Sequence, residues 1–206
     1  MLTLILVRHG ETDWRKSKKH TFRGQLDIPL NPTGITQAQS VGEILKKEKI
    51  DLVFSSPLIR AHDTAVEIAK LQNLDVIDHL GFTDLDFGDW QGINYQEISA
   101  SFPKLYQKWR TVPHTIEFPN GESLKVVRTR IENALTELAT KYDNENSNKS
   151  MVIVSHGAVL RVMMCYINNV GLANTWRYSI ANCAYTKVEL RFGKFNVIIE
   201  NEIGHL

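Results

Sequence analysis

Two histidines have similar surroundings in the sequence. Each follows an apolar run, with one residue in between, and each directly precedes a glycine. They are His9, which follows Arg8, and His156. A third apolar run leads into a segment that holds another arginine, Arg60. Neutral imidazole is a nucleophile near physiological pH, and guanidinium groups bind phosphate through paired hydrogen bonds. These residue types predict a phosphate site in which a histidine accepts the phosphoryl group.

Each of these residues, taken alone, has a commoner explanation. A lone histidine at a strand end is usually hydrogen-bonded to backbone, and a lone arginine is usually a solvated surface charge. Four cation-capable side chains in equivalent places are harder to explain in that way, because they repel one another unless an anion lies between them. We expect the neighbouring arginines to lower the pKa of His9, so that its imidazole stays neutral and nucleophilic.

Three buried strands must bring these side chains together. Their apolar runs lie at 2–7, 51–54 and 151–154. A continuous apolar run is typical of a strand covered on both faces, and open α/β sheets bind ligands beyond the carboxyl ends of their strands. We therefore expect the two histidines and Arg60 to meet at one edge of the sheet, where helix N-termini also favour an anion.

Helices are expected at four places around these strands. They begin at Asn31-Pro32, at Ser56 as N-cap with Pro57 in the first turn, and over 122–142 and 158–167. In the first of them, Ile35, Ala38, Ile44 and Leu45 are the predicted buried positions. The segments 184–192 and 195–202 predict a hairpin through Gly193-Lys194. This order predicts a three-layer α/β/α sandwich around a mostly parallel sheet, with the hairpin adding an antiparallel edge.

The composition excludes several classes of protein. The chain has 206 residues, 24 Lys and Arg, and 23 Asp and Glu, so its net charge of +1 offers no field for holding nucleic acid or an anionic membrane. Its two cysteines indicate no disulfide framework. Without a membrane span or a signal sequence, we expect one cytoplasmic domain over 1–206, as a monomer or a homodimer.

A phosphoryl transfer also needs an acid that protonates the departing oxygen. The segment 83–90 supplies three carboxylates, Asp84, Asp86 and Asp89. For any one of them, a solvated acidic turn is the commoner explanation. No clustered set of His and Asp has the spacing of metal ligands, so we expect neither a metal nor another cofactor.

The sequence resembles the histidine phosphatase superfamily, the group related to cofactor-dependent phosphoglycerate mutase. The matching motifs, in the order of the family, are LVRHGETDW (6–14), FRGQLDIPLNPTG (22–34), LVFSSPLIRAHDTA (52–65), LDFGDWQG (85–92), NGES (120–123) and VSHGAVLR (154–161). The arginine-histidine-glycine triplet alone is a weak signal, whereas six motifs in register are a strong one.

The resemblance implies a role for each matching residue. His9 is similar to the nucleophile that forms a phosphohistidine, Arg8 and Arg60 to the arginines that bind the phosphate, and His156 to the second histidine of the site. Glu122 corresponds to a residue near the pocket with a supporting role.

The chain departs from the family pattern at two of these positions. Asp84 stands where the family usually has a glutamate as the acid, so Asp86 and Asp89 stay open as substitutes for the shorter side chain. Arg15 stands where an asparagine often binds the phosphate. It is either an extra phosphate donor or, as the basic run after it favours, a side chain in solvent.

The resemblance leaves three functions to be separated. Mutases of this family are longer, whereas here residues from about 91 to 121 form only a short cap, which admits water and favours hydrolysis of small phosphate monoesters. The alternatives are a phosphoglycerate mutase and a phospholigand-binding relative with weak catalysis. Aromatic residues of the cap either line the pocket or, as we expect, pack in the core.

Overall fold

The computed structural model describes residues 1–13, 21–142 and 148–206, which form a six-stranded sheet with helices around it. The strands are β1 (Leu2–Arg8), β2 (Leu52–Ser55), β3 (Val76–Asp78), β4 (Lys149–Ser155), β5 (Tyr185–Arg191) and β6 (Lys194–Glu202). Their order is β3-β2-β4-β1-β5-β6. The first four in this order are parallel, β5 is antiparallel to β1, and β6 is antiparallel to β5. The predicted mostly parallel sheet with an antiparallel hairpin edge is confirmed.

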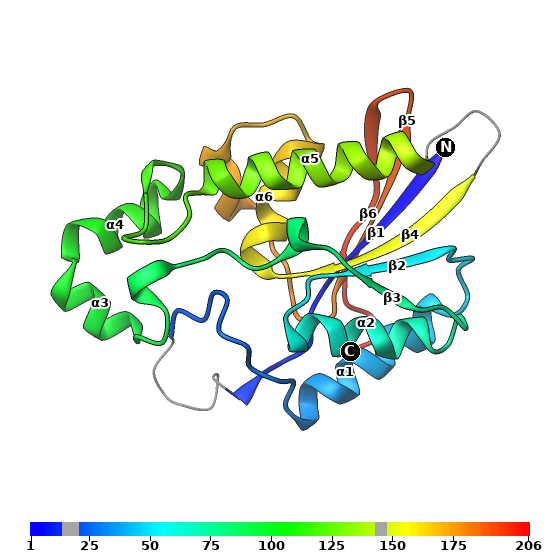
Figure 1. Cartoon of the computed structure of the whole chain (residues 1–206), viewed down its shortest axis with the longest axis horizontal. Helices are drawn as coiled ribbons and strands as arrows, with labels where there is room; N and C mark the ends of the chain where they lie inside the picture. Colours follow the sequence, from blue (N-terminus) through cyan, green and yellow to red (C-terminus); the bar gives the residue numbers. More distant parts are fainter. Residues whose placement is uncertain (14–20, 143–147) are drawn as a thin grey trace.

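Helices cover both faces of the sheet, which gives three layers (Figure 1). They are α1 (Pro32–Leu45), α2 (Ile59–Ala69), α5 (Leu124–Tyr142) and α6 (Gly157–Ile167). Successive side chains of a strand point to opposite faces. Accordingly, Leu4 and Leu6 of β1 pack in the cluster that includes α5 and α6. Ile5 and Val7 pack in the cluster that includes α1 and α2.

The segment between β3 and α5 extends beyond the strand ends (Figure 1). It contains α3 (Tyr95–Ser101), α4 (Pro103–Thr111) and short 3-10 helices at Leu80–Phe82, Gly88–Trp90 and Pro113–Thr115, whereas a further 3-10 helix, Leu172–Arg177, lies between α6 and β5. Trp90 and Ile98 anchor it to the core, since neither is exposed to solvent. These two helices lie within the segment that the sequence predicts as a short cap.

The start of α1 lies directly against the chain that leaves β1. Asn31 caps α1 by accepting a hydrogen bond from the Gly34 backbone N–H. A Cβ on Gly34 would lie 2.1 Å from the Glu11 carbonyl oxygen, and one on Gly10 would lie 2.5 Å from the Gly34 oxygen. Only glycines permit this contact, which holds the loop after His9 in place.

Two local predictions are wrong. Helix α2 begins at Ile59 after Leu58, and no side chain caps it. Ser56, the predicted cap, instead places its hydroxyl 2.7 Å from His156. In α1, Ile35 is 44% exposed. The predicted Ala38 and Leu45 are buried, but Gly34, Val41 and Gly42 complete the buried stripe of α1 in place of Ile35 and Ile44. Gly42 allows close packing on α2, since a Cβ there would lie 2.8 Å from the Glu67 carbonyl oxygen.

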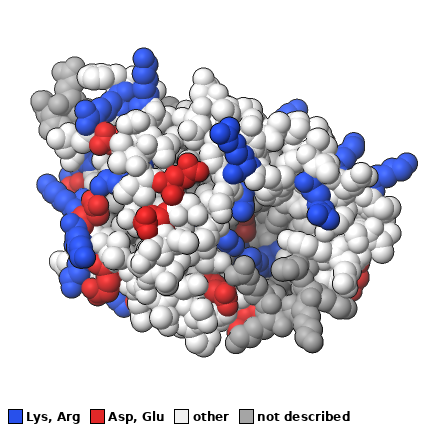
Figure 2. Space-filling view, turned by 180° about the vertical axis from the view of Figure 1, so that it is seen from behind, with Lys and Arg blue, Asp and Glu red and all other residues white. Residues whose placement is uncertain are grey.

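The surface carries charges of both signs. On the face shown in Figure 2, Lys and Arg occur in small groups between Asp and Glu, and a hollow in this face has Lys or Arg atoms at its bottom. Within the described ranges, no helix is long and apolar enough to cross a membrane. Both cysteines, Cys165 and Cys183, are buried free thiols.

Candidate active site

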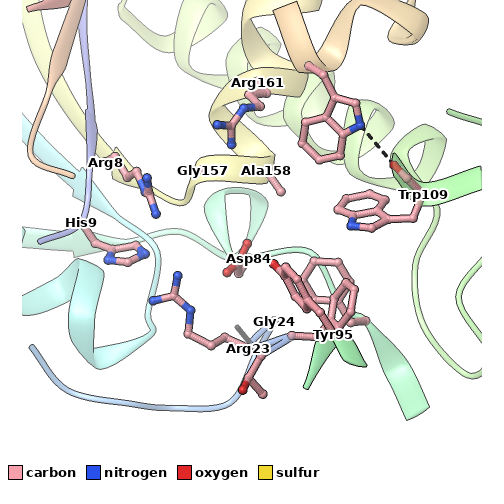
Figure 3. Close-up of a pocket in the computed structure, with 14 residues that line it drawn as sticks. Arg8, His9, Arg23, Gly24, Asp84, Tyr95, Trp109, Gly157, Ala158 and Arg161 are labelled. Atoms are coloured by element: carbon pink, nitrogen blue, oxygen red, sulfur yellow. Dashed lines mark hydrogen bonds between the residues drawn. The ribbon is translucent and has the colours of Figure 1, made fainter. Parts of the chain in front are cut away.

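A cavity of about 200 Å³ lies where the carboxyl ends of β1 and β4 face the cap helices (Figure 3). Its charged or titratable lining residues are Arg8, His9, Arg23, Asp84, Tyr95 and Arg161. Two further predicted site residues, Arg60 and His156, do not line the cavity; both are fully buried and contact Asp84 from behind. The structure therefore brings five of the predicted residues together from four separate segments of the chain.

The backbone fixes the tautomer of His9. The ring Nδ1 of His9 lies 2.6 Å from the carbonyl oxygen of Gly10, and the backbone N–H of His9 donates to the Ser155 carbonyl at 3.0 Å. A carbonyl oxygen only accepts hydrogen bonds, so Nδ1 carries the proton of the neutral ring. The Nε2 lone pair is consequently available to a ligand in the cavity.

His156 is oriented by a serine on the neighbouring strand end. Its Nε2 lies 2.7 Å from Ser56 Oγ, and that oxygen also accepts a longer hydrogen bond, 3.3 Å, from the Leu58 N–H. The arrangement that satisfies both groups has the Ser56 hydroxyl donating to Nε2, which places the proton of the ring on Nδ1. Nδ1 is buried without a hydrogen-bond partner in the described residues, 3.6 Å from Asp84 Oδ2.

Both imidazoles are held neutral by their surroundings. Burial lowers the pKa of His9 well below its ordinary value, and the charges of Arg60 and Arg8 lower it further. Burial also lowers the pKa of His156, followed by the charge of Arg60 and the effect of His9. The two ring centroids are 5.2 Å apart. A neutral Nε2 on His9 is the form that can attack phosphorus.

Asp84 lies at the centre of the polar contacts. Its Oδ2 accepts a hydrogen bond from Arg60 Nη2 at 3.0 Å, and its Oδ1 accepts one from the Leu85 N–H at 2.9 Å. Arg60 also donates to the carbonyl oxygens of Leu26 and Gly24. The Arg60 guanidinium is thus fixed by three acceptors, while the Asp84 side chain keeps 13% of its surface exposed.

The other two candidate acids, Asp86 and Asp89, do not line the cavity. Asp86 Oδ1 accepts from the Gly88 N–H at 2.8 Å, in a local turn. Asp89 is exposed and accepts two hydrogen bonds from Asn120 Nδ2. Among the three carboxylates, Asp84 is the one that lines the cavity.

Glu122 lies behind the loop that carries Asp84 and not among the cavity-lining residues. Its Oε1 accepts from Arg130 Nε at 3.0 Å, and its Oε2 accepts from the Asp86 N–H at 3.0 Å. Arg130 in turn donates to the carbonyl oxygens of Gly81 and Asp84. The Glu122–Arg130 pair therefore supports the backbone of the loop.

Comparison with known proteins identifies the family of the chain. A family model, the Histidine phosphatase superfamily (branch 1), matches residues 4–202. The chain belongs to the histidine phosphatase superfamily. It is a phosphatase of that superfamily, a phosphoric monoester hydrolase, as the resemblance of its motifs predicts.

Relatives of the superfamily match over nearly the whole chain. Phosphoserine phosphatase 1 of Hydrogenobacter thermophilus is 34% identical over 203 residues, covering 98% of this chain and 93% of its own. The glucosyl-3-phosphoglycerate phosphatase of Mycobacterium tuberculosis is 31% identical over 179 residues, covering 83% of this chain and 77% of its own. The solved structure of Bacillus stearothermophilus YhfR has a TM-score of 0.91 at 25% identity and covers 100% of this chain and 99% of its own.

Two arginines of this histidine phosphatase site escaped the sequence analysis, although both lie in the quoted motifs. Arg23 enters the cavity and donates to Thr12 Oγ1 at 2.7 Å. Arg161 enters from α6, and its Nε donates to the Tyr178 carbonyl at 2.9 Å. The sequence signal that could have indicated them is their place in two of the quoted motifs, in FRG (22–24) and in AVLR (158–161). Arg15 lies outside the described residues.

The aromatic residues of the cap divide between core and cavity. Trp90 is fully buried, as predicted for the core. Trp109 also belongs to the buried core, and one side of it lines the cavity together with Tyr95 and with Trp176 from the segment after α6. The Trp109 and Trp176 rings meet edge to face at 4.7 Å, and Trp176 Nε1 donates to the Trp109 carbonyl at 3.1 Å. The wall opposite His9 is accordingly aromatic (Figure 3).

Proposed function

We propose that this chain hydrolyses small-molecule phosphate monoesters through a phosphohistidine on His9, without a metal ion. The observation that carries the proposal is the buried, neutral His9 with its Nε2 lone pair available, beside Arg8 and Asp84 in one cavity. The related mycobacterial glucosyl-3-phosphoglycerate phosphatase, with a TM-score of 0.87 at 27% identity, has been solved in complex with inorganic phosphate, so a site of this fold accepts the product.

The first step transfers the phosphoryl group to the enzyme. The Nε2 lone pair of His9 forms a bond to phosphorus while the bond from phosphorus to the leaving oxygen breaks. Asp84, in its protonated form, gives a proton to that oxygen, and the alcohol departs. Arg8, which lines the cavity, stabilises the negative charge of the phosphoryl oxygens in flight. The Nδ1–H of His156 lies next to Asp84, and the His156 ring centroid is 5.2 Å from that of His9, so it supports this charge from beneath the cavity and not as a lining residue.

The second step returns the enzyme to its starting state. The Asp84 carboxylate accepts a proton from a water molecule, whose oxygen forms a bond to phosphorus as the bond to Nε2 breaks. Inorganic phosphate leaves, Asp84 is protonated again, and His9 is neutral. In this scheme Arg60 holds the Asp84 carboxylate in place, and Glu122 acts on the loop rather than on the substrate.

The decisive experiment is rapid quenching with a radiolabelled phosphate monoester in the presence of EDTA. We expect a phosphorylated protein, turnover undiminished by the chelator, and loss of both label and turnover in His9→Ala. His62→Gln, an exchange of a partly exposed histidine that does not line the cavity, serves as the control. Activity that disappears with EDTA and returns with zinc would contradict the proposal.

The same preparation separates the remaining alternatives. With 3-phosphoglycerate, release of phosphate indicates a phosphatase, whereas formation of an isomer without release indicates a mutase. A ligand-binding relative would bind the monoester, release phosphate at background rate and be indifferent to His9→Ala.

A further inference from the structure

The peptide bond between His9 and Gly10 is hydrogen-bonded at both ends by side chains that the proposed chemistry does not use. Its carbonyl oxygen, which is that of His9, accepts a hydrogen bond from Asn182 Nδ2 at 2.8 Å. Its N–H, which is that of Gly10, donates to Thr64 Oγ1 at 3.1 Å. Asn182 and Thr64 are both buried, and neither lines the cavity. Two buried polar side chains therefore hold one peptide plane beside the nucleophile.

Asn182 takes the place of a backbone donor that the sheet does not supply at this point. The ladder between β1 and β5 ends before His9. The Cys183 N–H still donates to the Arg8 carbonyl at 2.9 Å, but Cys183 has φ +53°, which interrupts the extended backbone ahead of β5. The next carbonyl of the first segment, that of His9, is bonded to the Asn182 side chain instead. A buried carbonyl needs such a partner.

Thr64 reaches the same peptide from the opposite side of the chain fold, from helix α2. Its hydroxyl donates to the Arg60 carbonyl at 2.8 Å, which leaves the lone pairs of Oγ1 to accept from the Gly10 N–H. Both hydrogen bonds of the hydroxyl are thus made, and their directions are fixed. The contact joins the loop of the nucleophile to the helix that carries Arg60.

The orientation of this peptide determines where the following carbonyl lies. The carbonyl oxygen of Gly10 is the atom 2.6 Å from His9 Nδ1, and it keeps the ring proton there. Glycine has the widest freedom in φ and ψ, and a Cβ at position 10 would collide with Gly34. Because a peptide bond is planar, partners at its two ends fix its rotation. Holding the peptide before Gly10 therefore limits the motion by which the Gly10 carbonyl could leave the imidazole.

The imidazole of His9 points from the end of β1 into the cavity (Figure 3). We propose that Asn182 and Thr64 are positioning residues, which act through the His9–Gly10 peptide to keep the ring proton on Nδ1 and the lone pair on Nε2. Once either contact is lost, the Gly10 carbonyl shifts and the ring populates both tautomers, one of which has its lone pair on the wrong nitrogen. This inference rests on the proposed function, because it concerns the same nucleophile.

Two substitutions remove the contacts one at a time. Asn182→Ala deletes the amide, and Thr64→Val deletes the hydroxyl in a side chain of similar shape. We expect each to lower kcat on p-nitrophenyl phosphate by about 10- to 100-fold with KM changed by no more than about twofold, because a displaced reacting group slows the chemical step. Thr64→Ser, which keeps the hydroxyl, should restore most of the rate. The double variant should be little slower than either single one, because both act on one peptide.

Nitrogen-15 NMR of the histidine rings near neutral pH gives a readout that does not depend on turnover. The signals of His9 are those that disappear in His9→Gln. We expect the Nδ1–H tautomer in the unaltered protein, a mixture of tautomers in Asn182→Ala and in Thr64→Val, and a return to the Nδ1–H tautomer in Thr64→Ser. A residue that only stabilised the fold would not change this equilibrium.

Matched controls remove similar hydrogen bonds far from this peptide. Asn168→Ala deletes an amide that donates to the Met164 carbonyl at 2.9 Å, and Thr129→Val deletes a helical hydroxyl that donates to the Lys125 carbonyl at 3.2 Å. Neither residue lines the cavity. Both variants should keep the rate and the His9 tautomer of the unaltered protein.

Four results would overturn the inference. An unaltered kcat, or a lower kcat with the His9 spectrum unchanged, would remove the role in positioning. A raised KM with unchanged kcat would place these residues on the substrate side, and losses that multiply in the double variant would mean that they act independently. In each case a phosphorylated protein that depends on His9 leaves the proposed function intact. Absence of any phosphorylated protein, with the expected change of tautomer, would contradict the proposed function and leave the positioning role.

Discussion

Ser56 Oγ and His156 Nε2 are 2.7 Å apart, although 100 residues of chain separate them. The two residues directly follow the neighbouring parallel strands β2 and β4, and the Ser56 N–H donates to the Val154 carbonyl at 3.0 Å, which joins the strand ends. The hydroxyl therefore determines which nitrogen of His156 carries the proton. Because Nε2 accepts from Ser56, the protonated Nδ1 is the atom that faces Asp84.

Ser56→Ala should reduce kcat with little effect on KM, because His156 loses the partner that selects its tautomer. We expect a decrease of about 10²-fold, the order seen when a donor to a transition-state oxyanion is removed. Nitrogen-15 NMR of the imidazoles should show His156 changing from the Nδ1–H form to a mixture, and Ser56→Thr should restore both signals and rate. Ser99→Ala, at a partly exposed serine of α3 that does not line the cavity, is the control. An unaltered spectrum in Ser56→Ala would contradict the assignment.

Asp84→Asn should slow substrates with poor leaving groups far more than p-nitrophenyl phosphate, because an amide gives no proton to a departing alkoxide. We expect a loss of about 10²- to 10⁴-fold in kcat on alkyl phosphates. Asp89→Asn, which alters an exposed carboxylate hydrogen-bonded to Asn120, should leave both classes unchanged. The measurement is kcat against leaving-group pKa, and an equal loss on every substrate would argue against an acid role for Asp84.

Stability should fall as the solution becomes more acidic than pH 6.5. The folded-state pKa values of His9 and His156 both lie well below this ordinary value, so below it the unfolded chain binds more protons than the native protein. The free energy of unfolding then decreases with falling pH, by up to about 1.4 kcal/mol per pH unit for each histidine, and the decrease ends below the folded pKa.

Urea unfolding between pH 7.5 and 5 measures this dependence. His9→Gln and His156→Gln should each reduce the slope, because each removes one imidazole that is held neutral in the folded protein. A stability independent of pH across this range would mean that the two imidazoles are not held neutral.

Glu122→Ala should lower both the stability and the rate of turnover. The substitution leaves the Nε–H of the partly buried Arg130 and the Asp86 N–H without their acceptor, which costs about 1–3 kcal/mol of unfolding free energy. Because the same loop carries Asp84, kcat on alkyl phosphates should fall while KM changes little. Glu43→Ala, on the exposed face of α1, should alter neither quantity. A rise in KM with unchanged stability would instead indicate that Glu122 contacts the substrate.

The sequence by itself determined the architecture and the family of this protein. Continuous apolar runs show which segments are buried on both faces, and the carboxyl ends of parallel strands meet at one edge, so the sequence alone predicts that His9 and His156 lie together. The start of α1 at Asn31-Pro32 was predicted correctly, because the side chain of Asn31 caps the helix through a backbone N–H only three positions along the chain.

Only the tertiary structure decided which polar groups meet. The hydroxyl of Ser56 was predicted to cap a helix, but it donates a hydrogen bond to an imidazole 100 residues away. Asp84 rather than Asp86 or Asp89 faces the cavity because the backbone of its loop is held by Arg130, and Arg161 enters the cavity because Tyr178 and Trp176 fix its plane. Apolar periodicity encodes which face of an element is buried, whereas a hydrogen bond depends on ångström-scale distances between segments that meet only when the whole chain packs.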